Sequence, residues 1–233
     1  MKIDNGIILT GGTGSRLAPQ TFFFNKHLLN IGNKFIIDYP LKTLSEIGVK
    51  NLTVVLGGPH FAQIVSYLKD GKNFDMNINY VYQEEPKGIA QAINLCKNFV
   101  TNKFITILGD NIFSKPLFFD TTKSAQIALY NHPELNRFGV ASYSLSGELL
   151  SIIEKPKRLP KKANNYAITG CYLFDNKFFD YFNKLVISDR GEYEITDIIK
   201  MYAKNDDLDQ IYVDGIWSDA GTHESLNFLN HTL

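Results

Sequence analysis

The spacing of apolar residues predicts alternating strands and helices in the first half of the chain. Short apolar or alternating runs, typical of strands, occur at residues 6–9, 51–56, 77–83 and 103–108. Between these runs, apolar residues recur at helical spacing at residues 35–48, 60–69 and 88–99. This alternation favours a parallel, doubly wound sheet with right-handed crossovers.

The second half has more strands and fewer helices. The expected strands cover residues 126–130, 138–144, 149–154, 165–174 and 210–213, and the expected helices lie near residues 176–187 and 194–204. We expect these strands to extend the sheet and to form a lid over one end of a pocket. The whole pattern predicts an α/β fold with a doubly wound, mixed and mainly parallel sheet flanked by helices. We expect one domain over residues 1–233, with halves at 1–115 and 116–233.

Charge and composition narrow the function classes. Lys plus Arg and Asp plus Glu each number 24, so a general nucleic-acid or membrane surface is not expected. No apolar stretch has transmembrane length, and the N-terminus leads into the first strand without a signal-peptide pattern. We therefore expect a cytoplasmic protein. Cys96 and Cys171 lie in apolar patterns typical of reduced core thiols.

The five histidines have no zinc-ligand spacing, and no G-x-S-x-G motif of a serine hydrolase occurs.

A glycine-rich loop follows the first predicted strand. Gly11, Gly12 and Gly14 leave the backbone nearly bare, so consecutive N–H groups can approach phosphate oxygens, and Arg16 adds a fork of donors. A Walker A loop is excluded because no Lys-Ser or Lys-Thr follows, and a dinucleotide loop would need a small residue at Leu17. A purely structural turn would explain neither the arginine nor the position after a strand. The loop predicts a polyphosphate ligand.

Asp110 follows the apolar strand at residues 103–108. Ligands of open α/β sheets gather beyond the carboxyl ends of strands, so we expect Asp110 to face the glycine-rich loop. An isolated aspartate in this place can also serve as a helix cap or a turn residue.

The motifs together resemble those of the sugar-1-phosphate nucleotidyltransferases. The first is G-G-x-G-x-R-L with Lys26 beyond it. The others match Q-x-x-P-x-G-[IL]-A-[QE]-A, L-G-D-N, E-K-P, Y-A-x-T-G, G-E-x-E-I-T-D and W-x-D-x-G-T, at residues 83–92, 108–111, 154–156, 166–170, 191–197 and 217–222. The similarity extends from Gly6 to about Leu226, and within the family it is strongest to the glucose-1-phosphate thymidylyltransferases.

The resemblance implies a reaction. An oxygen of a sugar 1-phosphate, with glucose 1-phosphate favoured, attacks the α-phosphorus of dTTP or UTP, and pyrophosphate leaves. Positioning and charge neutralisation supply most of the catalysis of such transfers. The product would be a nucleotide-sugar for cell-surface polysaccharide. The first half would bind the nucleotide and the second half the sugar.

The resemblance also implies site residues. Catalytic roles fall to Arg16, Lys26 and Asp110, with Lys26 neutralising the leaving pyrophosphate, and Asp110 and Asp219 would bind Mg²⁺. The expected nucleotide-binding residues are Leu9, Gly11, Gly12, Thr13, Gly14, Gln83 and Gly88. The expected sugar-phosphate-binding residues are Gly139, Glu154, Lys155, Thr169 and Gly170.

Some of these roles have plainer alternatives. Gln83 alone could be an ordinary polar residue at a strand end, and its amide could read uracil, thymine or, after a flip, cytosine. Glu154 and Lys155 could be a solvated pair. We interpret the segment around Thr196 mainly as a cap for the next helix, with Thr196 as the N-cap.

Two features depart from the resemblance. Phe138 stands where the family commonly has the tyrosine of R-Y-G, which leaves the sugar preference open. The chain also stops soon after Thr222, where longer thymidylyltransferases continue into a helical part tied to oligomer contacts and feedback. We therefore expect a homo-oligomer to be a dimer rather than a tetramer. For Phe22, Phe23 and Phe24 we expect core packing first.

Two alternative functions stay open. One is a cytidylyltransferase that acts on another sugar or alcohol phosphate. The other is a catalytically silent nucleotide-sugar sensor, although a sensor would need neither a metal-binding carboxylate pair nor a cation for the leaving group.

Overall fold

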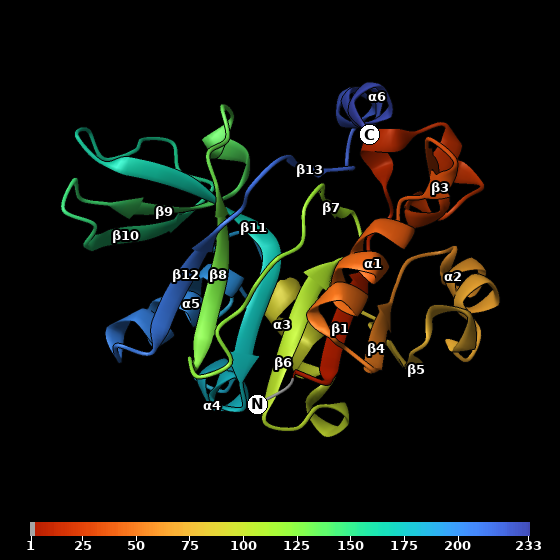
Figure 1. Cartoon of the computed structure of the whole chain (residues 1–233), viewed down its shortest axis with the longest axis horizontal. Coiled ribbons are helices and arrows are strands. Elements are labelled where there is room, and N and C mark those ends of the chain that lie inside the picture. Colours follow the sequence, from red (N-terminus) through yellow and green to blue (C-terminus); the bar gives the residue numbers. More distant parts are fainter. Residues whose placement is uncertain (1–2) are drawn as a thin grey trace.

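A mixed β-sheet forms the centre of the computed structural model, which describes residues 3–233 (Figure 1). The main path of the sheet has the order β10-β9-β11-β6-β1-β4-β5, and β8 pairs with both β11 and β12. The strands of this sheet are β1 (Asn5–Thr10), β4 (Asn51–Leu56), β5 (Asn77–Tyr82), β6 (Lys103–Leu108), β8 (Ala125–Tyr130), β9 (Gly139–Tyr143), β10 (Leu149–Glu154), β11 (Asn164–Asp175) and β12 (Leu208–Tyr212).

Helices cover both faces of the sheet, as a doubly wound fold requires. They are α1 (Asp38–Ile47), α2 (Phe61–Leu68), α3 (Ile89–Asn94), α4 (Lys177–Phe182) and α5 (Ile195–Lys204). On β1, Ile8 faces a core that includes Leu44 of α1 and Ile64 of α2. Its neighbour Ile7 faces the opposite core, to which α3, α4 and α5 contribute. Successive side chains of a strand point to opposite faces, so the apolar run of β1 is buried on both sides.

The two halves of the chain share this one sheet. The strands β6, β1, β4 and β5 are parallel to one another, and their carboxyl ends form a common edge. β11 pairs antiparallel with β6 through residues 171–175 and with β9 through residues 164–167. Figure 1 shows β9 and β10 extending away from the parallel strands. The expected fold class is confirmed.

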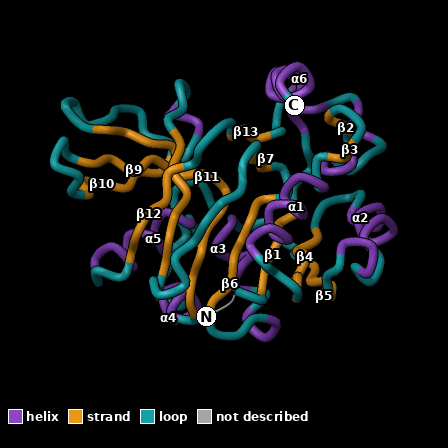
Figure 2. The backbone as a smooth tube through the Cα atoms, in the orientation of Figure 1, coloured by secondary structure: helices purple, strands orange, loops and turns teal. Residues whose placement is uncertain are grey.

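Several short elements escaped the sequence pattern. They are β2 (Asn30–Ile31), β3 (Lys34–Phe35), β7 (Asn111–Phe113), β13 (Trp217–Asp219) and α6 (His223–Thr232), with 3₁₀ turns at Ser15–Leu17, Gln20–Phe22, Lys26–Leu28, Lys72–Phe74, Lys97–Phe99 and Leu135–Arg137. β7 and β13 pair antiparallel with each other. Figure 2 shows them as a bridge between the strands of the second half and α6.

Four expectations were wrong. The helix expected near residues 176–187 ends at Phe182. α3 stops at Asn94, short of the expected end at residue 99. Thr196 is not an N-cap, because α5 begins at Ile195 and Glu194 holds the cap position without a side-chain bond to the helix. Phe22, Phe23 and Phe24 do not pack in the core, since 65%, 72% and 56% of their surfaces are exposed.

Within residues 3–233, no helix has the length and apolar character needed to cross a membrane. The cytoplasmic location and the boundary near residue 115 stay predictions.

Candidate active site

Two adjoining cavities open beyond the carboxyl ends of the parallel strands. The larger has a volume of about 520 Å³ and the smaller about 230 Å³. Four residues line both cavities, namely Ile89, Leu108, Asp110 and Glu192. Because Asp110 lies at this junction, a ligand in either cavity would meet its carboxylate.

The structure brings most of the expected site residues to these cavities. The smaller cavity is lined by Leu9, Gly11, Lys26, Gln83, Gly88 and Asp110 from the expected set. The larger cavity is lined by Arg16, Asp110, Gly139, Glu154, Lys155, Gly170 and Asp219 from that set. Gly12, Thr13, Gly14 and Thr169 line neither cavity, so their roles in binding stay predictions.

The glycine-rich loop needs glycine at two positions. Gly12 and Gly14 have φ angles of 94° and 65°, in the left-handed region that other residues rarely adopt. The Gly14 carbonyl accepts a hydrogen bond from the Thr21 hydroxyl at 2.9 Å. A Cβ on Gly14 would also lie 3.1 Å from Cβ of Lys26, so the loop packs directly against the lysine.

Lys26 and Asp110 form an ion pair at the junction of the cavities. Nζ of Lys26 lies 2.5 Å from Oδ2 of Asp110, and both side chains are at least 85% buried. Burial is the largest single influence and disfavours the charge of Asp110, but the charges of Lys26 and His27 and the hydrogen bonds from Lys26 and Asn111 together outweigh it and lower the pKa of the carboxyl below its usual range. Asp110 is therefore ionised at neutral pH.

Side chains from α2 fix the backbone around Lys26. Gln63 donates through Nε2 to the Phe23 carbonyl at 2.9 Å and accepts from the Asn25 N–H at 2.8 Å. Asn25 in turn accepts from the His27 N–H at 3.1 Å, and its Oδ1 lies 2.8 Å from Nδ1 of the His27 ring. The segment that carries Lys26 is thus fastened to α2 on one side and to the glycine-rich loop on the other.

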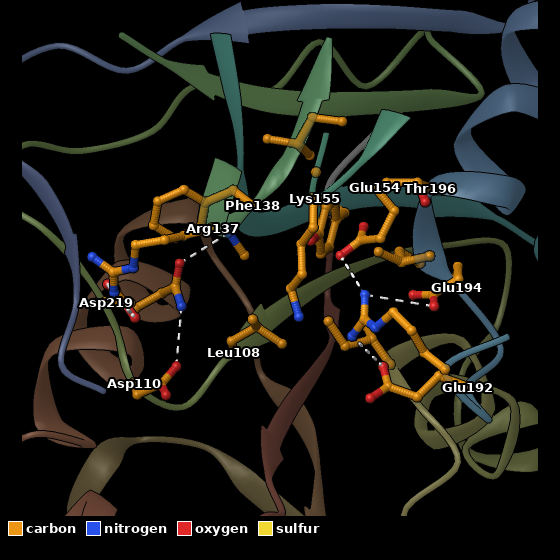
Figure 3. A pocket seen from close by; sticks show the side chains of 18 of the residues that line it. Leu108, Asp110, Arg137, Phe138, Glu154, Lys155, Glu192, Glu194, Thr196 and Asp219 are labelled. Carbon is orange, nitrogen blue, oxygen red and sulfur yellow. Dashed lines mark hydrogen bonds and ion pairs between the residues drawn. The ribbon is translucent and has the colours of Figure 1, made fainter. Parts of the chain in front are cut away.

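Asp219 lies across the junction from Lys26. Nη2 of Arg137 donates to both carboxylate oxygens of Asp219 at 3.0 Å, and the Ala220 N–H donates to the Asp110 carbonyl at 2.8 Å. Burial and the charge of Asp110 raise the pKa of Asp219. The two carboxylates are therefore close enough to repel each other, and Figure 3 shows both of them, with Arg137 beside Asp219.

This carboxylate pair fits a magnesium ion that takes its remaining ligands from a substrate. Mg²⁺ is usually bound by one or two carboxylates together with phosphate oxygens and water. Among residues 3–233, no group of three or more His, Cys, Asp or Glu side chains could enclose a metal ion. Asp110 and Asp219 fit Mg²⁺ bound jointly with phosphate, and not a closed protein metal cage.

Asn111 connects three strands beneath the junction. Its Oδ1 accepts from Nε1 of Trp217 at 2.7 Å and from the Gly170 N–H at 2.9 Å. Its Nδ2 donates to Oδ1 of Asp110 at 3.1 Å. One buried amide therefore orients the carboxylate and joins β7, β11 and β13.

Another part of the larger cavity holds a cluster of one arginine and three glutamates, of which Glu192 also lines the smaller cavity. Nη1 of Arg190 lies 3.1 Å from Oε1 of Glu154 and 3.6 Å from Oε1 of Glu194, and Nη2 lies 3.1 Å from Oε2 of Glu192. Burial, and then the charge of Glu194, raise the pKa of Glu154. Figure 3 shows Lys155 between this cluster and the Asp110 corner. This part of the cavity offers carboxylate acceptors for hydroxyl groups and cations for a phosphate.

Sequence reasoning missed several residues of the larger cavity. Arg137 and Arg190 have no assigned role in the motifs, although Arg190 directly precedes the G-E-x-E-I-T-D segment and Arg137 directly precedes Phe138. Their carboxylate partners Asp219 and Glu154 are 82 and 36 positions away. Only the fold brings such pairs together.

Comparison with known proteins matches this geometry to a family. A family model described as nucleotidyl transferase matches residues 5–233. The chain is 38% identical over 232 residues to the glucose-1-phosphate thymidylyltransferase of Neisseria meningitidis, which covers 95% of this chain and 80% of the relative. It is also 38% identical over 234 residues to the enzyme of the same name from Xanthomonas campestris pv. campestris, covering 95% and 78%.

Solved structures give the same result. A Bacillus anthracis protein assigned as a glucose-1-phosphate thymidylyltransferase, in complex with a sucrose, superposes with a TM-score of 0.89 at 40% identity, covering 98% of this chain and 94% of that one. UDP-glucose pyrophosphorylase complexed with UDP-glucose shares the fold, with a TM-score of 0.86 at 21% identity over 99% and 98% of the two chains. The resemblance inferred from the motifs is confirmed, and the chain belongs to the nucleotidyl transferase family.

Proposed function

We propose that this protein transfers a nucleotidyl group from dTTP or UTP to a sugar 1-phosphate, with glucose 1-phosphate favoured, and releases pyrophosphate. The relatives at 38% identity are named for this reaction. The two cavities supply room for two substrates side by side.

The position of Asp110 carries the proposal. Its carboxylate lies where the cavities meet, beside Lys26 and opposite Asp219. A triphosphate that extends from the smaller cavity would reach this point, and so would the phosphate of a sugar held in the larger cavity. An in-line attack needs this convergence of nucleophile and α-phosphorus.

The nucleoside would occupy the smaller cavity. Gln83 and the backbone of Gly11 and Gly88 line it, and apolar residues complete its wall. Lys26 would neutralise the charge that grows on the leaving pyrophosphate, and Arg16, which lines the larger cavity, would bind the triphosphate from the opposite side.

The sugar phosphate would occupy the larger cavity. Lys155 would contact its phosphate, and Glu154 would accept hydrogen bonds from sugar hydroxyls. Asp110 and Asp219 would hold Mg²⁺, and the ion would supply positive charge to the phosphate oxygens. The role of the chain itself is alignment, because a phosphate oxygen is already a competent nucleophile.

A substrate grid tests the proposal. Purified protein with Mg²⁺ is offered dTTP, UTP, CTP, GTP and ATP, each with glucose 1-phosphate and with other sugar 1-phosphates, and pyrophosphate release is measured. We expect turnover with dTTP or UTP and a sugar 1-phosphate. A folded protein that binds a nucleotide but is silent over the whole grid would contradict the proposal. That result would favour an enzyme for another sugar or alcohol phosphate first, and the sensor second.

A further inference from the structure

A hydrogen bond between two glutamine side chains lies at the wall of the smaller cavity. Nε2 of Gln83 donates to Oε1 of Gln91 at 2.5 Å. Oε1 of Gln83 points elsewhere, since a Cβ added to Gly11 would lie 3.1 Å from it. The two ends of the Gln83 amide therefore have different surroundings.

Both glutamines are held by regular backbone. Gln83 follows the last residue of β5, is only 7% exposed, and its N–H donates to the Leu56 carbonyl at 2.9 Å. Gln91 lies in α3, which begins directly after Gly88. A strand end and a helix thus set the distance between the side chains, so their bond is part of the fold.

Gln83 is also well placed to read a base. Of the residues that line the smaller cavity, it has the only neutral side chain that can hydrogen-bond. The charged members of the lining are Lys26, Asp110 and Glu192, and the remaining side chains are apolar or absent. Apolar walls can stack on a base but cannot distinguish its edge atoms, so among the neutral side chains directional reading falls to Gln83.

Pyrimidines differ in the hydrogen-bonding edge that an amide would meet. N3 of uracil and thymine donates a proton, whereas N3 of cytosine accepts one and the neighbouring amino group donates. An amide that turns its oxygen to N3 therefore suits uracil and thymine, and the flipped amide suits cytosine. A freely rotating amide would accept either base.

We infer that Gln91 is a positioning residue for base selection. By accepting from Nε2 of Gln83, it fixes the amide orientation and makes the cavity select uracil or thymine over cytosine. This inference rests on the proposed function, which supplies the favoured nucleotides, and it adds the residue that enforces the choice.

Three variants of one position separate orientation from packing. Gln91→Glu can only accept and should retain the wild-type preference for dTTP and UTP over CTP. Gln91→Met has no oxygen that can accept from Nε2 of Gln83, so the Gln83 amide can turn either way. The preference for dTTP and UTP over CTP should therefore fall about 10-fold or more. Gln91→Lys can only donate, so it should turn Gln83 around and favour CTP further.

The readout is the ratio of kcat/KM for dTTP to kcat/KM for CTP, with the same sugar 1-phosphate. The ratio of equilibrium affinities for the two triphosphates, from calorimetry, is measured in parallel. A purely structural role would lower both activities without moving either ratio. Gln210→Met is the matched control, since Gln210 also accepts a side-chain hydrogen bond, from Tyr143 at 3.2 Å, but lies on β12 away from the cavity.

The outcomes distinguish this inference from the proposed function. Suppose that wild type turns over and that the ratio of kcat/KM for dTTP to kcat/KM for CTP stays within 2-fold of the wild-type value in Gln91→Met and Gln91→Lys. The inference would then be overturned, and the proposed function would stand. Absence of wild-type turnover would overturn the proposed function. The ratio of the affinities for dTTP and CTP would then test the inference. The inference fails if wild type binds the two triphosphates equally, or if the variants keep the wild-type ratio.

Discussion

At the scale of single residues, each of the two aspartates at the junction of the cavities has its own cation. Asp110 is paired with Lys26, and Asp219 with Arg137. Each cation lowers the pKa of its carboxyl and so opposes the effects of burial and, at Asp219, of the charge of Asp110.

His27, next to Lys26, should make folding sensitive to acid. Burial, followed by the charge of Lys26, lowers the pKa of its imidazole to about 3. In the unfolded chain a histidine titrates near the ordinary value of about 6.5, so below that pH the unfolded state binds a proton that the folded state does not. The stability contributed by neutral His27 is therefore present above pH 6.5 and is lost as the pH falls towards 3.

We predict that His27 alone lowers the free energy of unfolding by about 2 kcal/mol between pH 7 and pH 5. Denaturant titrations at both pH values measure it, and His27→Gln is the comparison because an amide does not titrate there. The variant should lose about 2 kcal/mol less than wild type over this interval. Equal losses in the two proteins would show that the ring is protonated or exposed in the folded state.

At the scale of elements, α2 positions the lysine of the site without touching the cavities. Gln63 binds the backbone on both sides of Phe24, ahead of Lys26. We predict that Gln63→Leu lowers kcat about 10-fold, since misplaced catalytic groups are costly, and leaves KM for the sugar 1-phosphate nearly unchanged. Steady-state kinetics on folded variant protein would check this, and an unchanged kcat would mean that the loop needs no support from α2.

The Asn111 amide joins the short strands to the sheet. Asn111→Leu leaves the buried N–H groups of Trp217 and Gly170 without their acceptor, and each such loss costs about 1–3 kcal/mol. We predict a loss of about 2–5 kcal/mol in the free energy of unfolding. In Trp217→Phe the indole donor is already gone, so adding Asn111→Leu should lower the free energy of unfolding by measurably less than it does in wild type. If the losses of the two single variants simply add in the double variant, the hydrogen bond is contradicted.

Sequence patterning predicted long apolar elements well and short bridging ones poorly. The expected bounds of β4, β6 and β10 match the structure because each strand is a dense apolar run. β7 and β13 have three residues each, too few to show a period, and α6 mixes only a few apolar residues into a polar helix. These short elements nevertheless place Asp219 opposite Asp110.

The residues of the site were likewise predicted in part and missed in part. Motifs around Asp110, Gln83 and Glu154 pointed to residues that do line the cavities, because each motif is a local stretch of chain. The partners Arg137 and Arg190 escaped notice, since an ion pair between distant segments leaves no local pattern. The exposed phenylalanines 22–24 were misjudged for a related reason, because composition alone does not tell which side of a loop faces the protein.

At the scale of the whole molecule, the reaction centre coincides with the seam between two types of sheet. Parallel strands supply Asp110 and the smaller cavity, and antiparallel strands with their loops supply Gly139, Glu154 and Lys155. β11 joins the two by pairing with β6 and with β9. In the expected dimer, each chain would still supply all of these residues to its own site. The dimer itself stays a prediction.

The proposed reaction centre at Asp110 is tested by pyrophosphate release from dTTP and glucose 1-phosphate, compared between wild type and Asp110→Asn. We predict that wild type requires nucleotide, sugar phosphate and Mg²⁺ together. Asp110→Asn should fold, and it should lose about 100-fold or more in turnover because the carboxylate at the junction is gone. An Asp110→Asn protein as fast as wild type, or release that does not need the sugar phosphate, would contradict the proposed convergence of both substrates on Asp110.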